Sequence, residues 1–190
     1  MALGTPKTII TAMEGERVIT HGRSGKKYTL YMTGLTKAID KLNKILEKYE
    51  RRTLTGVSRA ALMIRRRSLE LTPMDTGNLR ESCFVVWTGG VIGAGKSPNF
   101  VVGGERKATE KEVDTMYAQH NKQVDAFAGV YSVRKTPIAV IMYSAYYALL
   151  VHEQKRTYNH GQWKFLQTAL TQSRDDVKNI IKATLKEGGE

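Results

Sequence analysis

Two segments in the first half of the chain carry apolar residues at helical spacing. The first has Leu35, Ile39, Leu42, Ile45, Leu46 and Tyr49 on one face, with lysines away from it. The second has Leu54, Val57, Ala61, Ile64, Ser68 and Leu71. It should begin at a cap formed by Thr53 or Thr55 and end before Pro73, because the residue before a proline avoids helical angles. We therefore predict two amphipathic helices, each of which needs a core to pack on.

Two short apolar runs further along the chain have the composition of β-strands. Residues 82–88 and 138–143 are rich in β-branched and aromatic side chains. Residues 146–153 read as a short helix, and 162–186 have a long helical stripe. Between the two strands, residues 89–104 are rich in glycine and 105–127 are charged and compatible with a helix. The stretch 89–136 is therefore predicted to be an excursion inserted into the main fold.

The N-terminal residues 1–32 alternate short β-prone pieces with glycine-containing turns, which indicates a hairpin or an extended arm. The predicted fold class is α+β, with a small, mostly antiparallel sheet flanked by two or three long helices. Three parts are expected. They are an arm over 1–33, one core domain made of 34–88 and 137–187, and the insertion 89–136.

The chain is strongly basic, with 30 Lys and Arg against 18 Asp and Glu and a net charge of +12 over 190 residues. This charge favours an anionic partner, either nucleic acid or an acidic protein surface. Arg52, Arg59 and Arg66 recur every seven residues on one side of the second helix. They are candidate partner contacts, although a solvated charged face is the more common reason for such a pattern.

A single cysteine, Cys83, lies in the predicted strand 82–88 and has no partner for an internal disulfide. A small buried thiol is the usual interpretation of such a residue. The longest apolar stretches fall short of the roughly 20 residues of a membrane helix, so no membrane partner is expected. Residues 1–10 have no apolar segment of secretory type, so synthesis is expected in the cytosol.

The most specific short motif is Gly90 to Ser97, which fits the phosphate-binding pattern G-x-x-x-x-G-K-[ST] after a predicted strand. Nucleotide binding requires a helix that begins at Lys96 and Ser97, so that free N–H groups meet the phosphates. Pro98 and a β-prone, glycine-broken run follow instead. We therefore expect a glycine-rich surface loop and no cofactor.

The four histidines are scattered, and His152-Glu153 lacks the second histidine of the zinc-protease pattern. A structural or hydrogen-bonding role is expected for His152, and no metal site. No arrangement of nucleophile, base and acid stands out. The sequence therefore favours a protein that is not an enzyme.

Three blocks occur in order around the variable middle. They are Thr72-Pro73-Met74-Asp75-Thr76-Gly77-Asn78-Leu79-Arg80-Glu81-Ser82, then Tyr147-Ala148-Leu-Leu-Val151-His152-Glu153, then Trp163-Lys164-Phe165-Leu166 with Ala169-Leu170. Together they resemble the tail-completion and neck proteins of tailed bacteriophages, also described as minor tail components or head–tail connectors. The resemblance covers 53–87 and 138–186, which is less than half of the 190 residues.

The resemblance comes with two departures from the family pattern. The middle segment 89–136 is longer than usual, and Gln154-Lys155-Arg156 stand where a glycine is expected soon after Glu153. The residues that carry the resemblance are expected to define the fold. They are Pro73, Asp75, Thr76, Gly77, Leu79, Tyr147, Ala148, Val151, Glu153, Phe165 and Leu166.

The first block has a direct physical interpretation. Pro73 ends the helix, Asp75 can form an Asx turn, and Gly77 supplies a positive φ, so the chain reverses there. Tyr147, Ala148 and Val151 are spaced to pack one face of a short helix, and Glu153 is a candidate partner for a basic residue such as Arg80.

What the resemblance implies is a structural protein of the virion, made in the host cytoplasm and located at the head–tail junction. It would form a ring of identical subunits, sixfold or twelvefold, between the head connector and the tail tube. The expected partners are copies of itself, neighbouring neck, connector or tail-tube proteins, and DNA in the channel. The N-terminal arm and the 89–136 segment, with Phe100 and Phe127, are the expected contact regions. The alternative function is that of a basic nucleic-acid-binding protein.

Overall fold

The computed structural model describes residues 18–21, 27–30, 35–93, 98–104, 108–134 and 136–187. The chain divides into two compact units, Met1–Arg51 and Arg52–Glu190. In the first unit, strands β1 (Val18–His21) and β2 (Lys27–Leu30) pair antiparallel, with Val18 opposite Leu30. This is the hairpin form of the two alternatives predicted for the arm, whose other residues lie outside the described part.

The second unit is built around a three-stranded antiparallel sheet in the order β4-β3-β5. Its central strand is β3 (Cys83–Trp87), which pairs with β4 (Gly90–Gly93) on one side and β5 (Ala139–Tyr143) on the other. Six helices accompany the strands over the described residues, so the predicted α+β class is confirmed.

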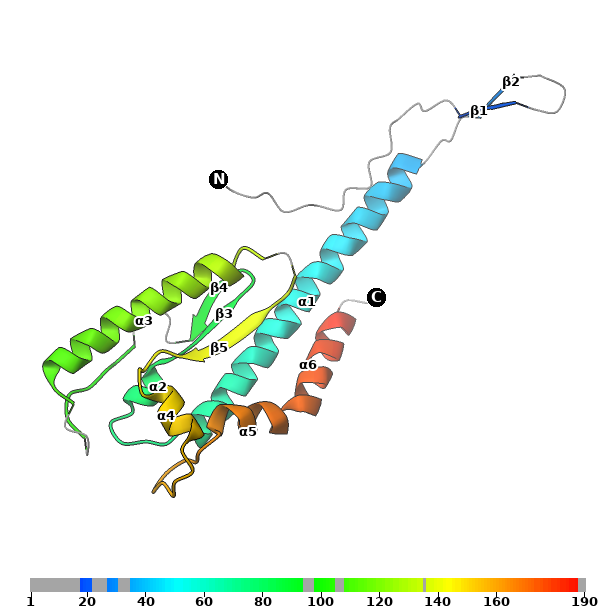
Figure 1. Ribbon diagram of the computed structural model, residues 1–190. Coiled ribbons are helices and arrows are strands. Elements are labelled where there is room, and N and C mark those ends of the chain that lie inside the picture. Colours follow the sequence, from blue (N-terminus) through cyan, green and yellow to red (C-terminus); the bar gives the residue numbers. More distant parts are fainter. Residues whose placement is uncertain are drawn as a thin grey trace. The chain divides into compact units, whose positions relative to one another are not determined.

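Helices cover both faces of this sheet (Figure 1). On one face, Val124 of α3 (Glu110–Tyr131) packs in a fully buried cluster with Phe84 and Val86 of β3. On the other face, the Tyr143 hydroxyl lies 2.7 Å from Ser68 Oγ and 3.0 Å from Thr72 Oγ1, and both of these belong to or adjoin α1. Burial raises the pKa of Tyr143, so this hydroxyl stays protonated in the interior.

The prediction of two helices before Pro73 is wrong, because a single helix, α1, runs from Leu35 to Leu71. Thr53 and Thr55 therefore lie inside the helix and do not mark its start. Gly56, in the interior of α1, lies where another helix packs closely against it. A Cβ there would lie 3.3 Å from the Cα of Ile181, so glycine allows helix α6 to approach closely.

The predicted C-terminal helix is also corrected, since it is two helices, α5 (Phe165–Gln172) and α6 (Arg174–Lys186). The chain turns sharply between them (Figure 1). The break lies at Ser173, which is fully buried and accepts a hydrogen bond from Arg67 Nη1 at 2.8 Å. Arg67 also pairs with Asp176 at 3.3 Å, so both sides of the break are tied to α1.

The segment 89–136 is integrated into the core of the second unit. It supplies β4, and it supplies α3, which packs on the sheet. α3 begins at a capping box, in which the Thr109 side chain accepts from the Glu112 N–H and the Glu112 side chain accepts from the Thr109 N–H. Among the described residues, no helix is long and apolar enough to cross a membrane.

The buried thiol predicted for Cys83 is confirmed, because its side chain is fully buried in β3. Burial raises the pKa of the Cys83 thiol from 9.0 to about 11, with the nearby Arg65 opposing this effect. Such a rise lowers the thiolate fraction near neutral pH roughly 100-fold. We expect a thiol reagent to label Cys83 only after denaturation. Mass spectrometry measures the labelling. Rapid labelling of the native protein would contradict this expectation.

Candidate functional site

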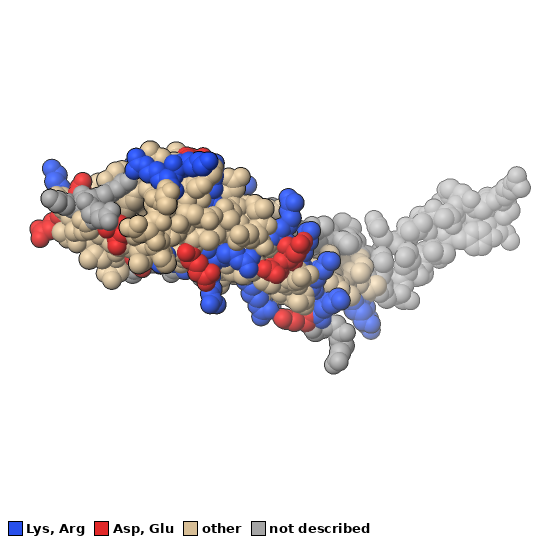
Figure 2. All heavy atoms as spheres, turned by 90° about the horizontal axis from the view of Figure 1, so that it is seen from below, with Lys and Arg blue, Asp and Glu red and all other residues tan. Residues whose placement is uncertain are grey.

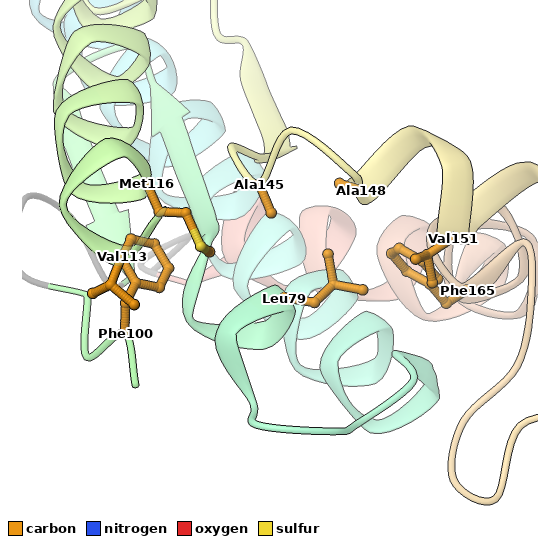
Figure 3. Packing of buried hydrophobic residues seen from close by; sticks show 8 residues of the cluster. All are labelled: Leu79, Phe100, Val113, Met116, Ala145, Ala148, Val151 and Phe165. Carbon is orange, nitrogen blue, oxygen red and sulfur yellow. The ribbon is translucent and has the colours of Figure 1, made fainter. Parts of the chain in front are cut away.

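The three blocks of the sequence meet in one buried cluster. Leu79 comes from the short helix α2 (Asn78–Glu81), Ala148 and Val151 come from α4 (Ala148–Glu153), and Phe165 comes from α5. Figure 3 shows these side chains together with Phe100, Val113, Met116 and Ala145. Tyr147 and Leu166 are partly buried against the same cluster. Segments that lie far apart in the sequence therefore form a single corner of the second unit.

The turn after Pro73 has the geometry that the sequence indicates at Gly77. This residue has φ 89° and ψ −9°, a left-handed conformation, and it precedes the first residue of α2. Thr76 Oγ1 accepts a hydrogen bond from the Asn78 N–H at 3.3 Å, so a side chain of the block stabilises this turn.

Replacing Gly77 with alanine is expected to lower the free energy of unfolding by about 1–2 kcal/mol, the usual cost of a left-handed conformation for a residue with a Cβ. No atom lies within 4 Å of the added Cβ, so the effect is conformational and not steric. Asparagine tolerates this region better, so Gly77→Asn should lose less stability. Urea unfolding of the two variants checks this order, and equal losses would refute the conformational explanation.

Asn78 ties the corner to a distant segment and was not identified from the sequence. Its side-chain amide donates to the Val101 carbonyl at 2.7 Å, and its Oδ1 accepts from the Val101 N–H at 2.7 Å. Glu81 Oε2 accepts from the Asn99 N–H at 3.1 Å. The polar atoms of α2 thus act as a backbone clamp for residues 99–101.

A second connection joins the loop before α5 to the end of α1. The Gln162 N–H donates to the Leu71 carbonyl at 2.8 Å, and the Lys164 N–H donates to the His152 carbonyl at 2.8 Å. Gly161 has φ 84°, and a Cβ at this position would lie 2.5 Å from the Pro73 nitrogen. The loop therefore packs directly on the Thr72-Pro73 backbone.

Glu153 pairs with two nearby side chains, one of them the basic residue Lys164. Its carboxylate accepts from Lys164 Nζ, and its Oε1 lies 2.8 Å from His152 Nδ1. The hydrogen bond from Lys164 and then that from His152 lower the pKa of Glu153. The expected pairing of Glu153 with a basic residue is therefore present, with Lys164 as the partner, whereas Arg80 donates to the Thr72 carbonyl at 3.1 Å. Glu153 thus links the side chains of α4 to Lys164, and Arg80 holds the backbone at the end of α1.

A cavity of about 350 Å³ lies at this corner. Residues 73–79 of the first block, residues 146, 147 and 151 near the second block, and residues 156–160 line it, with Gly103, Ala108, Glu112 and Met116. Its charged groups are the carboxyls of Asp75 and Glu112 and the side chain of Arg156, with His160 nearby. Over the described residues, no cluster of three metal-ligating side chains is present.

Of the three arginines proposed as partner contacts, two pair with the end of α6 and one faces solvent. Arg52 donates to the Leu185 carbonyl at 3.2 Å, and Arg59 pairs with Glu187 at 3.0 Å, so both hold the end of α6. Arg66 lies 3.4 Å from Glu70 and its side chain is 85% exposed. The seven-residue spacing of these arginines thus reflects two contacts between helices and one charge that faces solvent.

The aromatic residues proposed as contacts are less accessible than expected. Phe100 is only 6% exposed and packs edge-to-face on Tyr117, with ring centroids 5.0 Å apart. The expectation that Phe100 faces a partner is therefore wrong, because the fold itself covers this ring. Phe127 is partly buried and stacks on Tyr131 at 5.9 Å.

The phosphate-loop pattern begins inside a strand, since Gly90–Gly93 form β4 and pair with β3. Residues 98–100 after the motif are not helical, and the next helix begins at Glu110. The helix N-terminus that would meet phosphates is therefore not among residues 98–104.

His120 is a buried residue whose surroundings the sequence did not reveal. Its Nδ1 lies 2.7 Å from Ser144 Oγ, and this hydroxyl also donates to the Ser82 carbonyl at 3.3 Å. His120 is fully buried between the rings of Phe84 and Phe100. The pair links α3 to the end of β5 and is closed to any substrate from solvent.

Comparison with models of known protein families, with curated proteins and with solved structures finds no match for this chain.

Proposed function

We propose that this chain is a structural subunit of a tailed-bacteriophage particle, a neck or tail-completion protein that joins head to tail as a ring of identical copies. The proposal combines the resemblance of three sequence blocks with the place of those blocks in the fold. The function expected of the chain is to hold neighbouring proteins, and no chemical transformation is part of the proposal.

The observation that carries the proposal is the convergence of the blocks on one corner. Leu79, Val151 and Phe165 share a buried cluster, although 86 positions separate the first residue from the last. A polar residue of the first block, Asn78, binds backbone groups of the chain itself. Residues used in this way support a defined shape, as a scaffold protein requires.

Exposed apolar residues next to this corner support a role in assembly. Leu149 of α4 is 73% exposed, and Tyr146 and Leu150 beside it are exposed as well. Neighbouring exposed apolar side chains commonly mark protein–protein interfaces. The N-terminal half of α1 carries a second set of exposed apolar positions, namely Leu42, Ile45, Leu46 and Tyr49. Subunits that bind neighbours on several sides have this property.

The proposal is tested by locating the protein in phage particles and by imaging it after purification. Antibody labelling should place it at the head–tail junction, and native mass spectrometry with electron microscopy should show closed rings at high concentration. Labelling at any other location in the particle, or its absence from particles, would refute the proposal.

A basic nucleic-acid-binding protein is the second candidate, and the net charge of +12 favours it. On the face shown in Figure 2, however, Lys and Arg side chains are interspersed with Asp and Glu. A mobility-shift assay over a range of salt concentrations separates the two functions. Tight binding by the monomer with a steep salt dependence would favour the nucleic-acid function.

A further inference from the structure

Among the strands that the structure describes, β5 is an outer strand of its sheet and pairs only with β3. The Ser144 N–H donates to the Ser82 carbonyl at 3.0 Å, and the Thr88 N–H donates to the Ile138 carbonyl at 2.9 Å. Even-numbered residues from 138 to 144 therefore direct their backbone groups to β3, and the odd-numbered residues direct theirs outward. Within the described part of the chain, the outward N–H and C=O groups of Ala139 and Ile141 form no hydrogen bond.

An apolar groove of about 360 Å³ runs beside this open edge. Its lining includes Ala61 and Ile64 of α1, Ile141 of β5, Leu170 of α5 and Ile181 of α6. All 11 lining residues are aliphatic, and Leu170 at its rim is 56% exposed. An open strand edge beside a groove for apolar side chains is the arrangement that binds an added β-strand.

The same chain contains an element of the kind that this edge binds. The β1–β2 hairpin is a two-stranded sheet, with no third strand among the described residues. A hairpin of two strands is marginally stable by itself and gains stability from a further strand. Its outer backbone edges can supply the hydrogen bonds that Ala139 and Ile141 lack.

We propose that the β1–β2 hairpin of a second copy adds to the outer edge of β5 and covers the neighbouring apolar groove. The contact joins different surfaces of two identical chains, so it is a head-to-tail contact that can close into a ring. This inference rests on the proposed function and specifies which surfaces form the ring contact.

The test uses mixtures of full-length chains that each carry one added cysteine. One chain carries Ile19→Cys or Thr20→Cys in β1, and the other carries Ala139→Cys in β5. Under mild oxidation, a disulfide-linked mixed dimer is expected, and it can form only between two copies. The native Cys83 is buried and does not compete. The control mixture replaces Ala139→Cys with Val130→Cys, an exposed position on α3.

A second comparison tests the groove without altering the strand. Leu170→Asp introduces a charge at the groove rim, whereas Val130→Asp makes a comparable change at a residue that is 50% exposed and outside the groove. Leu170→Asp is expected to weaken self-association, measured by sedimentation, at least tenfold more than Val130→Asp. Ile141→Pro, which removes an outward N–H from an edge strand, should act like Leu170→Asp.

The outcomes separate this contact from the proposed function. If the wild type forms rings but the Ala139→Cys mixture gives no more mixed dimer than the control, the hairpin contact is refuted and the ring remains. Equal self-association of Leu170→Asp and Val130→Asp also refutes it. If the wild type stays monomeric at every concentration and is absent from phage particles, the proposed function fails as well.

Discussion

Replacing Gly161 with alanine is expected to lower the free energy of unfolding by about 2–4 kcal/mol, through an unfavourable backbone angle and a steric overlap. Gly161 has φ 84°, in the left-handed region. An added Cβ would lie 2.5 Å from the Pro73 nitrogen, 2.6 Å from the Thr72 carbonyl carbon and 2.7 Å from the Pro73 Cα. These are backbone atoms, so no side-chain rotation can relieve the overlap.

The matched control is Gly129→Ala in α3. Gly129 has no atom within 4 Å of an added Cβ, so alanine there should be neutral or stabilise the helix by up to about 1 kcal/mol. Urea unfolding monitored by circular dichroism gives both free energies. A Gly161→Ala variant as stable as Gly129→Ala would show that the loop of residues 156–164 does not pack on the corner as described.

The corner at Pro73 to Gly77 could be predicted because its causes are local. Proline ends a helix through its own ring, and Gly77 adopts a positive φ within its own turn. The importance of Gly161 and Asn78 could not be predicted in this way. Their contacts are with Pro73 and Val101, which lie far away in the sequence, and no periodicity encodes such pairs.

The helix boundaries show the same limit. Thr53, Thr55 and Gly56 have the composition of a helix start, yet α1 continues through them. Packing against Ile181 explains the glycine, and that contact is tertiary. Conversely, the stripe from 162 to 186 reads as one helix, while Arg67 binds Ser173 and Asp176 at the break between two. Tertiary contacts overrode local propensity in both cases.

Some features of the candidate site could be predicted from the sequence, and others could not. The clustering of Leu79, Val151 and Phe165 agrees with the expectation that their blocks define the fold. Phe100 was expected at a contact surface because it is an apolar residue of the 89–136 segment, and α3 covers it instead. The open edge of β5 could not be seen in the sequence, because strand order and hydrogen-bond direction follow from the assembled sheet.

Replacing Phe165 with alanine is expected to lower the free energy of unfolding by about 3–5 kcal/mol, the usual cost of removing a buried phenyl ring. Phe165 is 1% exposed and joins the blocks of the corner. Its ring packs edge-to-face on Tyr143 at 5.0 Å and on His152 at 4.9 Å. The variant removes both contacts and leaves a cavity between α4, α5 and the sheet.

The control is Leu170→Ala on the same helix. It makes a similar change to alanine at an exposed position, so the comparison separates the effect of burial from that of helix propensity. Leu170 is 56% exposed, so its truncation should cost less than about 1 kcal/mol in the monomer, since most of its surface is already in water. Thermal and urea unfolding at low protein concentration give the comparison. If Phe165→Ala were no more destabilising than Leu170→Ala, the corner would not be the stabilising centre of the second unit. The proposed function would then lose its structural basis, because a ring subunit needs a rigid frame behind its contact surfaces.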